Sequence, residues 1–352
     1  MAYRPGADPT AVPPSIIAMS SGLVKSPLIL AVLLWLGVIG PVAAQWDTKP
    51  INGREYVAVD GMKTFYGFDS LRRDGNEVVL ENKKVKVRLR VGGQECLMNG
   101  VKFVFSYKVE DVGGKAWISR IDLSKLVDPV LRPSYIDNAG NFRTVIIDAG
   151  HGGKDPGATN GLGTEATYNL QVAEKLRKLL TARGYKVIMT RETNRYLTLQ
   201  ERVDVANRVR DNAIFISIHH NSGGTAARGI ETFTLSPIGV AHYGRGINAS
   251  DFQERTGNSH DSANVALATA VHGSMSRRLG KNTFDRGIKR ARFSVLTGVR
   301  HPSILVECGF MTHSYEARLI HTEAYRTAVT NGIAEAVERY RTAVTKKPVT
   351  KP

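Results

Sequence analysis

The chain has few cysteines and few acidic residues for its length. Cys96 and Cys308 are the two cysteines among 352 residues, which excludes a disulfide framework. We expect two buried free thiols, because the two lie in segments that the patterns below assign to different domains. Asp and Glu total 32 against 48 Lys and Arg, a net charge of +16. Such a charge predicts a polyanionic neighbour: nucleic acid, a membrane surface or an acidic cell-wall polymer.

The amino-terminal apolar run is short for a membrane span. Residues 28–39 form an apolar run of twelve residues, whereas a spanning helix needs about 20. Lys25 precedes this run, and Val42 and Ala44 follow it at the spacing of a cleavage site. We predict that residues 1–44 are a secretory signal peptide, with an uncleaved N-terminal anchor as the alternative. Export to the periplasm, cell envelope or medium argues against nucleic acid as a partner.

Residues 45–130 have the pattern of a small β-rich accessory domain. Apolar and polar residues alternate over 55–59, 76–80, 85–91, 101–107 and 116–119, with Gly or Asn-Gly between these segments. Lys84, Lys86, Arg88 and Arg90 place positive charge on one strand face. This face is either a docking surface for wall or substrate, or the solvated side of an antiparallel sheet.

A short helix over 121–133 and a Pro-bounded linker, placed at 131–142, precede a different pattern. Over 143–342 buried strands alternate with amphipathic helices, which predicts an α/β fold. We expect a mainly parallel twisted sheet with helices on both faces, phosphorylase/hydrolase-like. Strands are expected from 144 and over 185–190, 213–219, 229–234 and 302–307; helices are expected over 165–183, 197–210, 262–279 and 323–340. Residues 235–261 are expected to form a long loop, and 343–352 a disordered basic tail.

Three of these buried strands end in an ionisable residue. These residues are His151, which follows a glycine turn, His219 and Glu307; Glu165 opens the helix after that turn. Parallel strands bring such residues to one edge of a sheet. Two imidazoles and a carboxylate are a ligand set for catalytic Zn²⁺, and a second carboxylate can transfer protons. The pattern alone leaves open which glutamate is the ligand.

Eight motifs over about residues 143–340 resemble the zinc-dependent N-acetylmuramoyl-L-alanine amidases with a type 3 amidase domain. They occur in the order and at the spacing of that family. They are DAGHGGKDPG at 148–157, TEATYNL at 164–170, TRET at 190–193, LQER at 199–202, SIHHN at 217–221, GIET at 229–232, DRG at 285–287 and LVECGF at 305–310.

The resemblance implies a site and a reaction. His151, Glu165 and His219 match the zinc ligands of the family, and Glu307 matches its catalytic acid/base. The implied cofactor is Zn²⁺, and the implied substrate is peptidoglycan, cut between N-acetylmuramic acid and L-alanine. The alternatives are a zinc peptidase acting on stem peptides and a non-catalytic wall-binding protein. His220 stands where the family commonly has a small residue, and strand alternation predicts a neighbour rather than a ligand.

Other polar residues receive structural interpretations. Asp148 and Asn221 are candidates either to orient imidazoles or substrate amides, or to cap turns. Arg191 and Arg202 are expected to be internal ion-pair partners, and Glu231 to be structural. Cys308 should face the core, away from the chemistry.

Some amidases of the family block the metal with an inserted helix. In this chain Asp251, Glu254, His260 and Asp261 lie in the predicted loop, so autoinhibition by residues 235–261 is a further hypothesis. We expect a monomer, and the sequence leaves open whether a protein activator exists.

Overall fold

The computed structural model describes residues 46–137 and 139–345. The predicted signal peptide or anchor, and most of the predicted tail, lie outside these residues. None of the helices within them is both long enough and apolar enough to cross a membrane.

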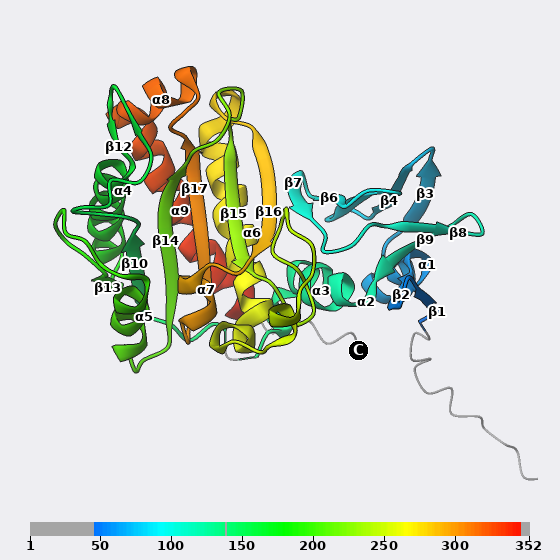
Figure 1. Ribbon diagram of the computed structural model, residues 1–352. Helices are drawn as coiled ribbons and strands as arrows, with labels where there is room; N and C mark the ends of the chain where they lie inside the picture. Colours follow the sequence, from blue (N-terminus) through cyan, green and yellow to red (C-terminus); the bar gives the residue numbers. More distant parts are fainter. Residues whose placement is uncertain (1–45, 138, 346–352) are drawn as a thin grey trace, which may run out of the picture. The chain divides into compact units, whose positions relative to one another are not determined.

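A sheet of mostly parallel strands forms the centre of the region after residue 139 (Figure 1). Its strand order is β13-β10-β14-β17-β15-β16, and all neighbours are parallel except β17 and β15. The strands are β10 (Thr144–Ala149), β13 (Lys186–Met189), β14 (Ala213–Asn221), β15 (Ile230–Leu235), β16 (Asp285–Ala291) and β17 (Ser303–Phe310). The predicted fold class is confirmed, although the sequence patterns predict no strand at β16.

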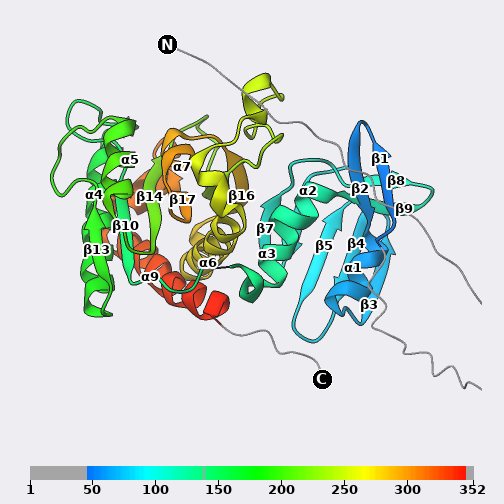
Figure 2. The same cartoon turned by 90° about the horizontal axis from the view of Figure 1, so that it is seen from below.

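Helices cover both faces of this sheet (Figure 2). Val145 and Ile147 of β10 belong to the core formed with α4, α6 and α9, whereas Ile146 belongs to the core formed with α5 and α7. Successive strand residues point to opposite faces, so an unbroken apolar run requires cover on both sides. The helices are α4 (Glu165–Ala182), α5 (Leu199–Arg208), α6 (Asp261–Leu279), α7 (Ser294–Gly298), α8 (Ser314–His321) and α9 (Glu323–Thr345).

The region before residue 138 is rich in β-strands, as predicted, and most of these strands pair antiparallel. One four-stranded sheet has the order β1-β2-β9-β8, and a meander continues the central sheet from β16 in the order β7-β6-β5-β4-β3. Its elements are β1 (Thr48–Ile51), β2 (Arg54–Ala58), α1 (Val59–Tyr66), β3 (Ser70–Asp74), β4 (Glu77–Glu81), β5 (Lys86–Arg90), β6 (Glu95–Met98), β7 (Val101–Val104), β8 (Glu110–Val112), β9 (Lys115–Ser119), α2 (Arg120–Asp122), the π-helix η1 (Leu123–Val127), α3 (Asp128–Leu131) and the 3₁₀ helix η2 (Pro133–Tyr135).

The basic strand face is paired with carboxylates. Lys86 lies 3.3 Å from Glu81, and Arg88 lies 2.8 Å from Glu77 on the neighbouring strand. These cross-strand pairs neutralise the row of positive charge that the sequence predicts. The structure therefore favours the solvated side of a sheet over a basic docking surface.

The antiparallel region is joined directly to the central sheet. Phe103 of β7 pairs with Ile288 of β16, and the backbone N–H of Lys102 donates a 3.0 Å hydrogen bond to Asp285. Gly287 has φ of +91°, and a Cβ there would lie 3.2 Å from Lys102. All described residues belong to one compact unit, so the predicted division into two domains stays a prediction.

The segment 236–260 lies at the edge of the sheet opposite the strand ends that carry the histidines. In the strand register, Glu231 of β15 lies opposite Glu307 of β17. From there β15 runs antiparallel to β17, so it ends on the side of the sheet away from the histidines. There Asp251 is buried between Arg245 and Arg292. The segment contains η3 (Ala249–Phe252) and η4 (Thr256–His260). The hypothesis that this segment blocks the metal is therefore wrong, because β15 carries it away from the histidines.

Candidate metal centre

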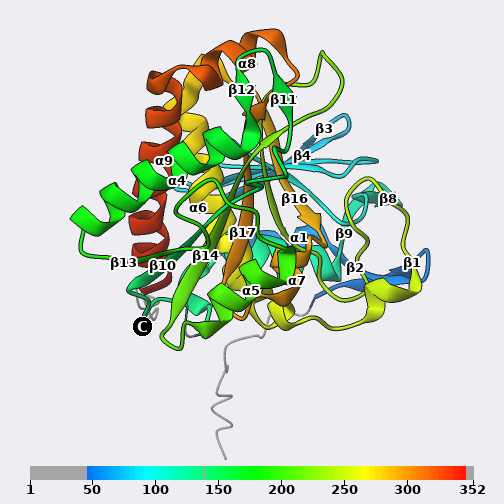
Figure 3. The same ribbon diagram turned by 60° about the vertical axis from the view of Figure 1, so that its left-hand side comes forward.

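β10, β14 and β17 lie side by side in the central sheet (Figure 3). β14 lies between β10 and β17, and His219 of β14 pairs directly with Glu307 of β17. His151 follows β10 by two residues at the same edge. The common direction of the strands explains why residues far apart in sequence meet here.

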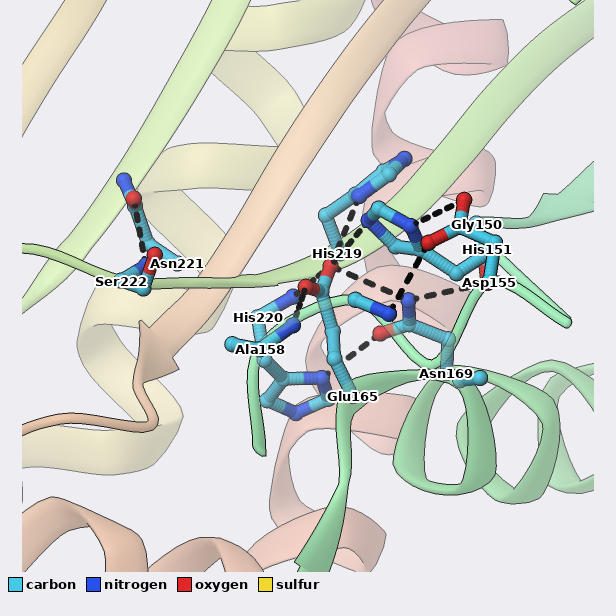
Figure 4. Close-up of polar contacts among 12 residues, drawn as sticks. Gly150, His151, Asp155, Ala158, Glu165, Asn169, His219, His220, Asn221 and Ser222 are labelled. Atoms are coloured by element: carbon cyan, nitrogen blue, oxygen red, sulfur yellow. Dashed lines mark hydrogen bonds and ion pairs between the residues drawn. The ribbon is translucent and has the colours of Figure 1, made fainter. Parts of the chain in front are cut away.

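His151, Glu165 and His219 converge on one point (Figure 4). Glu165 Oε1 lies 2.8 Å from His219 Nδ1 and 3.2 Å from His151 Nε2. One ligand atom from each residue lies within 4.8 Å of the others. Tetrahedral ligands of Zn²⁺, each about 2.0–2.2 Å from the ion, lie about 3.3 Å apart. The donor set and its spacing therefore fit a zinc ion.

Two glycines leave room for these side chains. A Cβ at Gly150 would lie 2.3 Å from the His219 ring, and one at Gly157 would lie 2.5 Å from Glu165. His151 has φ of +59°, a left-handed backbone conformation that non-glycine residues rarely adopt. The glycine-rich turn thus provides both the space and the backbone path that the cluster needs.

Glu165 is fixed by its place at the start of a helix. Thr164 caps α4 by accepting a hydrogen bond from the backbone N–H of Thr167. Glu165 is 5% exposed, and it also accepts hydrogen bonds from the backbone N–H groups of Ala158 and His220. Burial raises the pKa of Glu165, but hydrogen bonds with His151 and His219 outweigh burial and hold it well below its ordinary range. The carboxylate is ionised, which is the form that binds a cation.

Asp155 orients the first histidine, a role that we did not predict. Its Oδ2 lies 2.8 Å from Nδ1 of His151, the ring nitrogen that faces away from Glu165. A carboxylate on that nitrogen is a common support for a metal-binding histidine. Burial lowers the pKa of His151, but Glu165 and Asp155 outweigh burial and raise it. The only sequence signal is an aspartate four residues after the histidine in the turn.

His220 points away from the cluster, as predicted. Its side chain is fully buried, and its Nδ1 lies 2.8 Å from Asn169 Oδ1. Burial lowers the pKa of His220 to about 4, so the ring is neutral at pH 7. Asn169 also donates to the Gly150 carbonyl and to Glu165, so it links the neutral ring to the turn and to the cluster.

Glu307 has a carboxylate oxygen with no partner among the described residues. Its Oε2 is buried without a hydrogen bond. Burial and the charges of Glu165 and Glu231 raise its pKa well above the ordinary value. A raised pKa and a free oxygen suit a group that takes up and releases a proton.

Glu231 belongs to an ion-pair cluster beside Glu307. Its Oε1 pairs with Arg286 and lies 2.7 Å from Lys289 Nζ, and its Oε2 accepts a hydrogen bond from Asn221. Lys289 and Glu231 are both buried. Their opposite charges offset each other, which reduces the free-energy cost of burying them. Asn221 therefore binds a carboxylate here, and no imidazole.

Asp148 lies at the end of β10, before the glycine-rich turn, and its described partners include no imidazole. It pairs with Arg202 at 2.8 Å and accepts hydrogen bonds from Thr190 and Ser217. The ion pair predicted for Arg202 is therefore confirmed. Arg191 is different, because its hydrogen bonds go to backbone carbonyls, including those of Ala149 and Gly150.

Both cysteines are free and buried, as predicted. Burial raises the pKa of the Cys308 thiol well above its ordinary value, which disfavours a thiolate nucleophile.

The sequence of this chain is similar to those of known amidases. Residues 145–339 match a family described as N-acetylmuramoyl-L-alanine amidase. The chain is similar to the uncharacterized protein YqiI of Bacillus subtilis, with 35% identity over 56% of this chain and 84% of that protein. It is also similar to the N-acetylmuramoyl-L-alanine amidase AmiC of Neisseria meningitidis, with 32% identity over 59% of this chain. The match spans about half of AmiC, 55% of its length.

Among solved structures, the chain is similar to the catalytic domain of CwlV, an N-acetylmuramoyl-L-alanine amidase of Bacillus (Paenibacillus) polymyxa. The identity is 30% over 56% of this chain and 98% of that chain, with a TM-score of 0.46. The family match covers more than half of the sequence and includes His151, Glu165, His219 and Glu307. The His-Glu-His cluster within it is a zinc-type site of a metal-dependent peptidoglycan hydrolase. The chain belongs to the N-acetylmuramoyl-L-alanine amidase family.

Proposed function

We propose that the protein hydrolyses the amide bond between the lactyl group of N-acetylmuramic acid and L-alanine in peptidoglycan. The observation that carries this proposal is the convergence of His151, Glu165 and His219 within 4.8 Å at one strand edge, next to Glu307. The positions that match the family's three ligands and its acid/base are all filled in this chain, which argues against a non-catalytic wall-binding protein.

His151, Glu165 and His219 would hold the metal, which we propose to be Zn²⁺. When bound, zinc polarises the scissile carbonyl and lowers the pKa of a water ligand to about 7. Asp155 keeps Nε2 of His151 directed at the ligand point by engaging Nδ1. Asn169 steadies Glu165 from the other side.

Glu307 would serve as the acid/base. Its ionised carboxylate accepts a proton from the attacking water and then delivers it to the departing amine of L-alanine. The unpaired Oε2 is available for this transfer, and the raised pKa means that this carboxyl takes up a proton more readily than an ordinary glutamate.

We further propose that the protein acts outside the cytoplasm, after export by residues 1–44. Residues 45–130 would be an accessory domain, 131–142 a linker, and 143–342 the catalytic domain. The net charge of +16 suits the acidic wall polymers that an exported hydrolase meets.

Mass spectrometry of digested peptidoglycan tests the proposal. Peptidoglycan is incubated with the protein, with chelator, and with chelator followed by Zn²⁺. We expect free stem peptides that begin with L-alanine, lost on chelation and restored by zinc. Shortened stems that stay attached to glycan would instead identify a zinc peptidase, because the same site can serve both reactions.

A further inference from the structure

A pocket lined by aromatic rings lies in the region before residue 138, remote from the metal centre. It has a volume of about 490 Å³, and Trp46, Phe65 and Tyr66 contribute to its wall. The Trp46 and Phe65 rings are 5.1 Å apart, and Phe65 and Tyr66 meet edge to face at 4.9 Å. A Cβ at Gly61 would lie 2.8 Å from the indole of Trp46, so the glycine of α1 gives that ring its place.

Polar groups hold these rings in place and also line the pocket. The Arg132 guanidinium lies 4.5 Å from the centre of the Phe65 ring. Asp128 accepts hydrogen bonds from Arg132 at 2.7 Å and from the Tyr66 hydroxyl at 2.9 Å. The pocket therefore combines a rigid aromatic wall with a guanidinium and a carboxylate.

A second pocket adjoins the first. Its volume is about 520 Å³, and Glu55, Arg120 and Ser124 line both pockets. The exposed Arg120–Glu55 ion pair, at 2.7 Å, marks the boundary between them. The second pocket again has a ring beside a cation, because Arg54 lies 4.2 Å from the centre of the Tyr107 ring. We call these two adjoining pockets, which share Glu55, Arg120 and Ser124, the aromatic groove.

The lining of the aromatic groove suits a carbohydrate polymer. Sugar rings have apolar C–H faces that pack on aromatic side chains, and hydroxyl edges that need both donors and acceptors. Arg54, Arg120 and Arg132 supply donors, while Glu55 and Asp128 supply acceptors. Arg120 and Arg132 are paired with Glu55 and Asp128, so they offer little free positive charge to the phosphates of a nucleic acid. An apolar protein helix would have to desolvate this charge.

We propose that the aromatic groove binds the glycan strand of peptidoglycan and anchors the enzyme on its substrate. This inference rests on the proposed function and adds a second binding site to it. The second pocket includes Gly239, Ile247 and Phe252 of the segment 236–260, which lies at the sheet edge opposite the metal centre. A strand in the groove is therefore held away from the amide that is cleaved.

Substitutions at Ser124 test the groove while leaving its aromatic rings, guanidinium groups and carboxylates in place. Ser124 is exposed and lines both pockets. In the full chain, Ser124→Trp fills the groove and Ser124→Ala is its matched control. Phe65→Ala removes part of the wall, and Arg88→Ala, on the paired basic face, is a second control. The probe is peptide-free glycan strands of N-acetylglucosamine and N-acetylmuramic acid, with binding measured by calorimetry.

We expect Ser124→Trp and Phe65→Ala to weaken glycan binding about ten-fold or more, with both controls at the wild-type affinity. Hydrolysis of a soluble muramoyl peptide should be unchanged in all four variants, which also shows that they fold. Wild-type affinity in Ser124→Trp and Phe65→Ala, or no glycan binding by the wild type, would overturn the proposal. If neither the wild type nor any variant hydrolyses the muramoyl peptide, the proposed amidase function is wrong. The glycan-binding measurements would still show whether the aromatic groove binds glycan.

Discussion

At the scale of single residues, the metal centre depends on two glycines that leave space and on one carboxylate oxygen that has no hydrogen-bond partner among the described residues. Gly150 and Gly157 lack the Cβ that would meet His219 and Glu165. No group among residues 46–137 and 139–345 donates a hydrogen bond to Oε2 of Glu307. Each of these features makes a prediction that a single substitution can test.

Gly150→Ala should weaken metal binding by roughly 10–100-fold, the size of effect seen when the support of a ligand is lost. The new Cβ would lie 2.3 Å from the His219 ring, so the imidazole must move. Competition with a chelating dye measures the affinity. Gly161→Ala is the control, because a Cβ there meets nothing within 4 Å. Equal affinity of the two variants would contradict the crowding argument.

Glu307→Gln should lower kcat by roughly 10²–10⁴-fold, since the amide cannot accept the proton. Metal content, measured by mass spectrometry of the purified variant, should stay at the wild-type level because Glu307 is outside the His-Glu-His cluster. A variant that stays active would show that another group transfers the proton. Loss of metal would instead make Glu307 a ligand.

The pH dependence of kcat/KM should show an acid limb above pH 4.5, the ordinary pKa of a glutamate. The reaction needs ionised Glu307, and burial together with the charges of Glu165 and Glu231 raises its pKa. Activity is therefore lost as pH falls through that raised value. Glu231→Gln removes one of the charges, so its acid limb should move to lower pH. A limb that does not move would leave Glu231 without electrostatic influence on Glu307.

At the scale of elements, a buried ion pair fastens α5 beneath the glycine-rich turn. Arg202 of α5 binds Asp148 and also donates hydrogen bonds to the carbonyls of Ala149 and His151. The side chains of Arg202 and Asp148 are 4% and 1% exposed. The helix therefore contributes to the turn that presents His151.

Arg202→Met should lower the free energy of unfolding by about 3–5 kcal/mol, because it leaves the buried Asp148 charge without its partner. Urea unfolding followed by circular dichroism measures the loss. Arg208→Ala, at an exposed position of the same helix, should change the stability by less than about 0.5 kcal/mol. If both variants lose similar amounts of unfolding free energy, the buried ion pair contributes no more to stability than an exposed arginine does.

At the scale of the whole molecule, the antiparallel region and the catalytic region share a sheet. Asp285 ties β16 to Lys102 of β7, and on its other side it lies 2.8 Å from His272 of α6. The Tyr107 hydroxyl donates to the Gly239 carbonyl, and Arg290 donates to the Lys125 carbonyl. We infer that the two regions unfold together.

Tryptophan fluorescence and metal release should change at the same urea concentration. Trp46 and Trp117 both lie before residue 138, whereas the proposed metal ligands lie after it, so the two signals report on different regions. The measured protein carries Trp35→Phe, which removes the fluorescence of the third tryptophan. Two separate midpoints would show that the shared sheet does not couple the regions.

The sequence by itself determined most of the element types and, through the family motifs, which residues to expect at the site. Periodicity is a local property, so it predicted α4, α5, α6, α9, β14 and β17, and it placed His219 and Glu307 near the ends of buried strands. The ligand assignment came from the family motifs around His151 and Glu165.

Only the tertiary structure decided which distant residues meet. β16 escaped prediction because its Lys289 and Arg290 look solvent-exposed in sequence; Lys289 is buried against Glu231, 58 positions away. The antiparallel direction of β15 removed residues 236–260 from the metal centre, and the adjoining pockets of the aromatic groove arise from three separate segments. Strand order, strand direction and buried pairing are set by long-range packing, which local sequence patterns do not contain.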